Sequence, residues 1–194
     1  SLDAERWLAR LALDGGSLGN AALSLRRNPR QAEPPLDADI VINALNLDAL
    51  PVALPQGLSL AGRVTGKLTL AGSLKQPRAN GQLAWLDGIV KLPEFAIDWR
   101  PISLTANFLG DRVSWTGDLR DQEQGRARLT GDARLSKDWQ AALRIQGEQL
   151  SAGLKPMARL RFSPDLQIDA SAKAVKVRGQ ILVPYGRIKL EDIK

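Results

Sequence analysis

The feature that most constrains the fold of this 194-residue chain is an alternation of apolar and polar residues with a period of two. From Leu58 to Leu70 every even position is apolar or glycine, and most odd positions are polar. From Ala127 to Leu135 the odd positions are apolar or glycine, and the even ones are Arg, Thr, Asp and Arg. A helix would scatter such residues around its surface, whereas a strand places them on one face. The pattern therefore predicts strands with one apolar face.

The alternation returns along the chain about every 10 to 14 residues, which is typical of an all-β protein with short connections. Gly- and Pro-containing turn sequences separate many of the runs. They are Pro77–Gly81, Asp87-Gly88, Arg100-Pro101, Gly110-Asp111 and Ser163-Pro164-Asp165. We therefore expect an all-β fold in which each of these sequences ends a strand.

Two stretches leave their local structure open. Ser1 to Leu13 fits either a strand or a short helix, and the polar, Pro-containing segment 26–35 is expected to be a loop. Alternation resumes from Leu36 to Ile42, and Gln149 to Met157 is again ambiguous. We predict one elongated β domain over residues 1–194, in which residues 1–35 are a strand or helix followed by the Pro-containing loop.

The apolar face of such strands must be buried, and two architectures can do this. A closed barrel or sandwich fills its interior with side chains, whereas an open, curved sheet leaves an apolar trough. No run is apolar on both faces, and the apolar positions include no buried polar candidate. This favours a single sheet with one dry face and one wet face.

The composition excludes most catalytic and metal-dependent functions. The chain has no Cys and no His, so disulfides, Cys- or His-ligated metals and Ser-His-Asp or Cys-His catalysis are impossible. Asp118, Asp121 and Glu123 could supply a carboxylate pair, but their polar, Gly-containing context favours a turn. The glycines do not follow a phosphate-binding spacing. We expect no enzymatic activity, no cofactor and no metal.

Inward-facing glycines and tryptophans each have two interpretations. Gly62 and Gly66 share the parity of the apolar residues, which indicates a hairpin or bulge near Thr65-Gly66, or a place where the sheet bends or leaves room. Four of the five tryptophans (Trp7, Trp85, Trp99, Trp115 and Trp139) share parity with Leu or Ile. Their dry surroundings favour core filling over sugar stacking.

Two segments carry a resemblance to a known family. Pro51–Ile97 has a Leu-Pro-rich lead-in, then Gly-Leu-x-Leu-x-Gly, Leu-x-Leu-x-Gly-x-Leu-x-x-Pro and Asn-Gly-x-Leu. Val183–Asp192 reads VPYGRIKLED. Together they resemble the TamB family, over roughly Leu36 to Lys194, with little contribution from the first 35 residues.

The resemblance implies a fold and a setting beyond the sequence patterns. TamB-like proteins are large, anchored in the inner membrane by an N-terminal helix, and extend through the periplasm of Gram-negative bacteria. They work with an outer-membrane barrel protein, TamA, and belong to AsmA-like bridge proteins linked to phospholipid movement. Their fold is a sheet curled lengthwise into a U-shaped trough, or β-taco, with an apolar interior. This chain starts at Ser1 without an apolar run of 18 residues, so we expect a mid-to-late periplasmic segment without the anchor or the final C-terminal part.

With the resemblance, we interpret the apolar face as a groove for phospholipid acyl chains rather than a filled core. About twelve strands spaced about 4.8 Å apart give a trough about 55–60 Å long. The groove residues are predicted to be Leu60, Leu68, Leu70, Leu83, Trp85, Phe95, Ile97, Trp99, Leu104, Phe108, Val113, Trp115, Leu129, Leu135, Leu143, Ile145, Ile168, Val175, Val177, Ile181 and Val183.

The formal net charge of +6 has three interpretations. Nucleic-acid binding is disfavoured because Arg128, Arg134 and Arg144 alternate with apolar residues, as on a solvated outer face. Two interpretations of the charge remain. It could attract anionic lipid headgroups at a groove rim, or it could simply keep the protein soluble, and we favour solubility. The alternative functions are a scaffold for outer-membrane protein assembly through strand-edge pairing, and a spacer between two membranes.

Overall fold

The computed structural model describes residues 7–27, 37–50, 54–73, 76–154 and 158–188, which form an all-β structure. Its strands are β1 (Trp7–Asp14), β2 (Gly19–Arg27), β3 (Ala38–Asn46), β4 (Ser59–Gly72), β5 (Pro77–Leu92), β6 (Ile97–Gly110), β7 (Arg112–Asp121), β8 (Arg126–Arg134), β9 (Gln140–Glu148), β10 (Leu150–Leu154), β11 (Ala158–Ser171) and β12 (Val175–Ile188). Three short 3₁₀ helices lie between strands: η1 (Gly16–Leu18), η2 (Leu47–Ala49) and η3 (Pro93–Phe95). The first ambiguous stretch is thus a strand from Trp7, while most of the expected loop at 26–35 lies outside the described residues.

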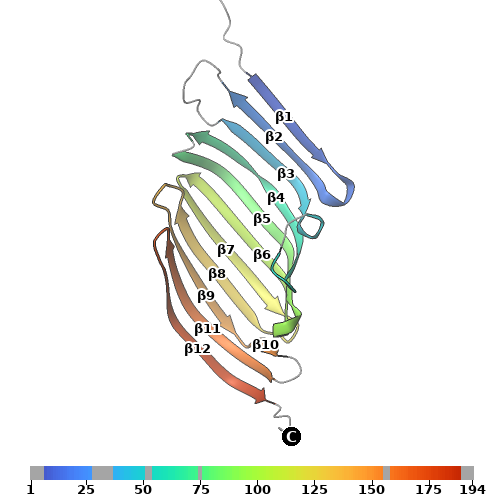
Figure 1. Ribbon diagram of the computed structural model, residues 1–194, viewed down its shortest axis with the longest axis vertical. Coiled ribbons are helices and arrows are strands. Elements are labelled where there is room, and N and C mark those ends of the chain that lie inside the picture. The colour runs from blue at the N-terminus through green and yellow to red at the C-terminus, as the bar shows by residue number, and fades with distance from the viewer. Residues whose placement is uncertain (1–6, 28–36, 51–53, 74–75, 155–157, 189–194) are drawn as a thin grey trace, which may run out of the picture.

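All twelve described strands belong to one open antiparallel sheet (Figure 1). From β1 to β9 each strand pairs with the next one in the sequence. β11 then pairs along one edge with both β9 and β10, and along its other edge with β12. The second ambiguous stretch supplies β10, which continues β9 after Gln149 adopts a positive φ of 52°. β12 is one edge of the described sheet.

The pairing register aligns the alternating residues of neighbouring strands on the same face. Four rows of apolar residues and glycine cross the sheet, and we number them from the β6–β7 turn. Row 1 is Ile40, Leu68, Gly81, Phe108, Val113, Ala133, Ala141, Ala170 and Val175. Row 2 is Ile42, Gly66, Leu83, Ala106, Trp115, Gly131, Leu143, Ile168 and Val177. Row 3 is Leu45, Val64, Trp85, Leu104, Gly117, Leu129, Ile145, Leu166 and Gly179. Row 4 is Gly88, Ile102, Leu119, Ala127 and Gly147.

Most of the expected turns lie inside long strands, which corrects the sequence analysis. Pro77–Gly81 and Asp87-Gly88 both belong to β5, and the register shifts on either side of Gly88. Arg100-Pro101 lies in β6 and Ser163-Pro164-Asp165 in β11, each within or next to a register shift. A bulge uses the same positive-φ or proline residues as a turn, so local sequence does not distinguish them. Gly110-Asp111 is a turn between strands, as expected.

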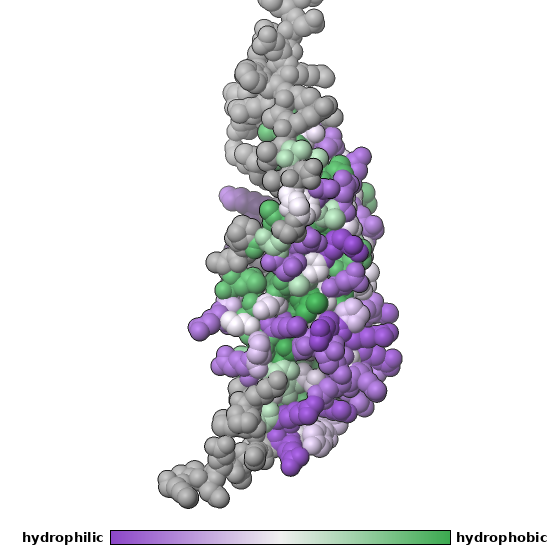
Figure 2. Space-filling view, turned by 90° about the vertical axis from the view of Figure 1, so that its right-hand side faces the viewer, coloured by the Kyte–Doolittle hydropathy of each residue, from purple (hydrophilic) through white to green (hydrophobic). Residues whose placement is uncertain are grey.

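The buried hydrophobic residues are few, and they lie toward both ends of the strands. Only eight hydrophobic residues among those described are buried, and three of them are alanines. Ile102, Leu119, Ala127 and Leu150 form the buried cluster, against which Trp85, Val90, Trp99, Leu129 and Phe162 pack. The space-filling view shows hydrophobic side chains gathered in a lengthwise strip, with hydrophilic side chains to the right of it (Figure 2). Row 4 is therefore filled, and Leu68 and Val113 of row 1 are also buried, whereas no residue of row 2 is.

Candidate functional site

The candidate site is the apolar face of the sheet along rows 2 and 3. No residue of row 2 is fully buried in the described structure, although Leu83, Trp115, Leu143 and Ile168 are each partly covered. At β12 the same face becomes exposed, and Val177 is 59% accessible. Apart from the indole N–H groups of Trp85 and Trp115, the side chains of this face have no hydrogen bonds to satisfy, so it suits contact with another apolar surface.

Glycines on this face lie beneath large aromatic side chains. A Cβ on Gly131 would lie 2.6 Å from the Trp115 ring and 2.3 Å from the carbonyl oxygen of Ala142. A Cβ on Gly62 or Gly88 would meet Trp85, whose indole N–H donates to the Ala61 carbonyl at 3.1 Å. Gly62 has φ 115° at a register shift, so the expected bulge is present, whereas β4 continues through Gly66 and the expected hairpin is absent.

At the end of the strands away from the β6–β7 turn, β10 packs against row 4. Leu150 is 2% exposed and packs in the row 4 cluster. β10 also contacts η3, β6 and β7, which lie away from its pairing partner in the sheet. β10 therefore covers part of the apolar face here, although it belongs to the same sheet.

A buried carboxylate fixes this closure. Asp121, at the end of β7, is 6% exposed. Its carboxylate accepts hydrogen bonds from the backbone N–H groups of Gly125 (2.6 Å), Glu123 (2.8 Å) and Ser151 (2.7 Å), and from the Ser151 hydroxyl (2.7 Å). Glu123 in the same turn pairs with Arg159 and Arg161 of β11. The acidic group at 118–123 thus holds a turn and β10 together, as its turn interpretation predicts, and Asp118 pairs separately with Arg128 at 3.1 Å.

The polar face carries exposed cross-strand ion pairs. They are Arg126–Glu148, Arg128–Asp118, Arg144–Asp165 and Arg178–Asp169. These side chains lie on the face opposite rows 1 to 4, because they alternate with the row residues along each strand. The arginines therefore cover the wet face of the sheet, which agrees with the solvated outer face expected from sequence.

Most of the predicted groove residues lie in strands and on the apolar face. Thirteen positions belong to rows 1 to 3: Leu68, Leu83, Trp85, Leu104, Phe108, Val113, Trp115, Leu129, Leu143, Ile145, Ile168, Val175 and Val177. Leu70 lies in the adjoining row, opposite Ala38 and Ala79. Leu60 and Trp99 are both opposite Val90, while Ile97 is opposite Leu92. Ile181 is opposite Pro164, and Val183 follows it in β12 with the same parity.

Two predicted groove residues, Phe95 and Leu135, and the tryptophan Trp139 lie outside the strands. Phe95 lies in η3 rather than in a strand and is 44% exposed, because Pro93 starts a helical turn and Ala96 closes it with φ 52°. Leu135 lies just beyond the end of β8. Trp139 precedes β9 and is 41% exposed. The residues that sequence reasoning missed are Leu150 and Ser151, whose short strand has no clear alternation.

A metal centre and a membrane-spanning helix are both absent from the described residues. They contain no group of three or more His, Cys, Asp or Glu side chains placed to hold a metal ion. Nor does any helix in the part of the chain that the structure describes have the length and apolarity to cross a membrane.

Comparison with known proteins links both halves of the chain to one family. The model of the TamB N-terminal domain matches residues 1–85, and that of the TamB C-terminal domain matches residues 116–194. The translocation and assembly module subunit TamB of Haemophilus influenzae is 28% identical over 160 residues, which is 81% of this chain and 12% of that relative. The match from residue 1 corrects the expectation that the first 35 residues contribute little. No solved structure matches the chain. The chain belongs to the TamB family.

Proposed function

We propose that this segment shields phospholipid acyl chains in a trough formed by rows 2 and 3, as part of a periplasmic conduit between the inner and outer membranes. The observation that carries the proposal is the incomplete coverage of these rows, since a filled β core would bury them. The proposal includes the groove residues predicted from sequence and a TamA-like barrel protein as partner. The name of the relative, a translocation and assembly module subunit, supports such an envelope role.

The energetic basis is the transfer of apolar surface out of water. Each Å² of acyl chain kept from water contributes about 25 cal/mol. Because this contribution is non-directional, an acyl chain can move from one strand to the next without breaking specific bonds. The cross-strand rows supply a continuous series of such contacts from β3 to β12, perpendicular to the strands. No bond is made or broken in this function, so no catalytic residue is needed.

The test is site-specific photocrosslinking in living cells with the full-length protein. A photoreactive residue replaces Leu129 or Leu143 on the apolar face, and the matched controls replace Arg128 and Arg144, the adjacent residues on the polar face of the same strands. We expect phospholipid adducts at Leu129 and Leu143 only. No adduct at any position in a folded protein, or equal adducts on both faces, would overturn the conduit.

A second function is a scaffold that pairs with incoming strands of outer-membrane proteins. The feature that favours it is β12, a 14-residue edge strand of the described sheet with exposed Val175 and Ile181. Strand addition to such an edge uses main-chain hydrogen bonds. The test places proline at Val177 in one variant and at Arg178 in another. Because alternate N–H groups of an edge strand point away from the sheet, only one of the two substitutions removes an N–H that could pair with an incoming strand. Loss of outer-membrane protein assembly at that position, with lipid crosslinking retained, would favour the scaffold.

A further inference from the structure

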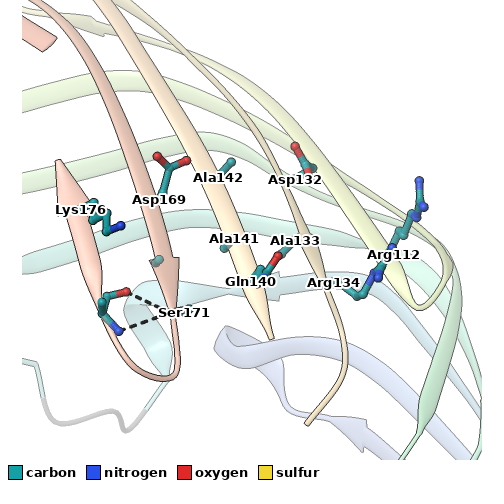
Figure 3. Close-up of a pocket in the computed structure, with 12 residues that line it drawn as sticks. Arg112, Asp132, Ala133, Arg134, Gln140, Ala141, Ala142, Asp169, Ser171 and Lys176 are labelled. Carbon is teal, nitrogen blue, oxygen red and sulfur yellow. Dashed lines mark hydrogen bonds between the residues drawn. The ribbon is translucent and has the colours of Figure 1, made fainter. Parts of the chain in front are cut away.

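A hollow of about 580 Å³ lies on the polar face, near the turns that follow β6, β8 and β11. Its middle is formed by β9, where Gln140, Ala141 and Ala142 carry no charge. β7 and β8 lie on one side of β9, and β11 and β12 on the other (Figure 3). Ala142 stands between Asp132 and Asp169, which are its direct cross-strand neighbours. The short alanine side chain leaves open the space that a longer residue would fill.

Charges of both signs flank this hollow. Arg112 and Asp132 line it on one side, and Asp169 and Lys176 on the other. Asp169 pairs with Arg178, but Arg112, Asp132 and Lys176 have no ion pair with any described residue. Two cations and one carboxylate are therefore available to a ligand.

This arrangement selects among ligands by charge. A simple anion would be attracted by Arg112 and Lys176 and repelled by Asp132, and a simple cation would meet the reverse. A group that carries a phosphate and an ammonium a few bonds apart can satisfy both. A zwitterionic headgroup thus fits better than a purely anionic one.

The hollow lies directly behind the apolar face. Arg112 precedes Val113 of row 1, and Gln140 precedes Ala141 of the same row, so the two faces meet at these strand ends. The hollow extends from the last strand residues to Asp132, two residues further along β8, which is about 7 Å. A lipid at this margin can keep its acyl chains on the apolar face while its headgroup extends past the turns into the hollow on the polar face.

We propose that this hollow binds the zwitterionic phosphate–amine headgroup of a phospholipid, with Arg112 holding the phosphate and Asp132 of the neighbouring strand the ammonium, while Lys176 adds positive charge on the far side of the hollow. This inference rests on the proposed conduit, because the acyl chains of the same lipid occupy the apolar face. It assigns a headgroup preference to one margin of the sheet.

The test measures binding of three lipids with identical short acyl chains to the purified protein by native mass spectrometry. They are phosphatidylethanolamine, phosphatidylglycerol and diacylglycerol. Asp132→Asn should weaken phosphatidylethanolamine binding about fivefold and strengthen phosphatidylglycerol binding by a similar factor, because one nearby charge is removed. Arg112→Gln should weaken both phospholipids about fivefold and leave diacylglycerol unchanged. Asp48→Asn, which removes an exposed carboxylate from η2 outside the hollow, is the matched control.

A steric variant tests the same site without changing charge. Ala142→Phe should fill the hollow and weaken both phospholipids at least as much as Arg112→Gln. Thr116→Phe adds the same ring to the polar face of β7 at a position outside the hollow, and should change neither.

The outcomes separate the two proposals. If wild-type protein binds none of the three lipids, the conduit fails. If it binds all three equally and Asp132→Asn changes nothing, the headgroup site fails while the conduit stands. Equal effects of Asp48→Asn and Asp132→Asn would also overturn the site, since net charge would then explain them. If free phosphoethanolamine binds as tightly as the lipid, the hollow is a site for a soluble ligand and its assignment to a lipid is wrong.

Discussion

Rows 2 and 4 of the same sheet are built from the same alternating sequence, but they are covered very differently. In row 4, Ile102, Leu119 and Ala127 are buried, because Leu150 of β10 packs against them. In row 2 none of the described residues is buried, and Leu83, Trp115 and Leu143 remain partly accessible. The comparison teaches that alternation specifies which side chains share a face, whereas what packs against that face decides whether it becomes a core.

The difference also separates stability from function. Row 4 with β10 supplies the buried cluster of the described residues, so changes there should act mainly on folding. Residues of row 2 are less buried, so under the proposed function substitutions there should mainly change lipid binding. Variants matched in chemistry but placed in the two rows can test this division.

The largest effect is expected from a charge placed in each row. Leu119→Arg buries a guanidinium among apolar side chains and should lower the free energy of unfolding by more than about 4 kcal/mol. Leu143→Arg lies on the partly open row, where the side chain can extend to water, and should cost about 1–2 kcal/mol. Urea denaturation measures both.

The same pair sharpens the functional comparison. Leu143→Arg should abolish lipid crosslinking at Leu129 while the protein remains folded, because a charge in the trough is costly to desolvate. Equal destabilisation by the two variants would show that rows 2 and 4 are covered alike, and the open trough would have to be abandoned.

A smaller effect follows from removing the residue that closes row 4. Leu150→Ala leaves a cavity in the cluster and should cost about 3 kcal/mol. Leu109→Ala removes the same group from a side chain that is 77% exposed and should cost less than about 0.5 kcal/mol. Thermal unfolding of both variants measures the difference. Similar melting temperatures would contradict the role of β10 as a cover.

The hydrogen bonds of Asp121 give the next effect. Asp121→Asn replaces one acceptor oxygen by a donor that faces N–H groups, and should cost about 2 kcal/mol. Asp132→Asn on the polar face should leave stability unchanged. Hydrogen exchange of the Ser151 amide checks the mechanism, since its protection should fall in Asp121→Asn alone.

The face of each strand could be predicted from sequence, and its cover could not. Alternation placed Leu68, Trp115 and Leu129 on the apolar side, because a period of two leaves no other arrangement in a strand. β10 has five residues and no alternation, and its position depends on the carboxylate of Asp121, 30 residues from Ser151. Such a long-range contact has no local sequence pattern.

Strand ends were predicted less well than faces, for a related reason. Asp87-Gly88 has turn-like residues, and Asp87 does adopt φ 52°, but the chain continues in β5 after a bulge. Only pairing with β6 on the neighbouring side decides between the two outcomes. Gly110, with φ 65°, is followed at once by β7 and does end its strand.

Glycine substitutions probe how closely row 2 is packed below its open surface. Gly131→Ala would place a methyl group against the Trp115 ring and the Ala142 carbonyl, and should cost about 1–3 kcal/mol. A Cβ on Gly186 of β12 meets no atom within 4 Å, so Gly186→Ala should be neutral. Chemical denaturation compares them. If Gly131→Ala did not change stability, the Trp115 ring would be free to move away from the added methyl group. Row 2 would then be packed more loosely than these distances indicate.

The smallest effect on stability is expected on the polar face, because the coverage of rows 2 and 4 concerns only the apolar face. Arg126 donates to Glu148 through Nε at 3.0 Å and through a terminal nitrogen at 2.7 Å, but the two side chains are 71% and 67% exposed. Water and salt screen such a pair, so Arg126→Gln should cost no more than about 0.5 kcal/mol and less at high ionic strength. Arg126 is adjacent to Ala127 of row 4 on the same strand, yet its side chain points to the other face. A loss comparable to that of Leu150→Ala would show that the wet face also contributes to closing the sheet, and the division of stability between the two faces would be wrong.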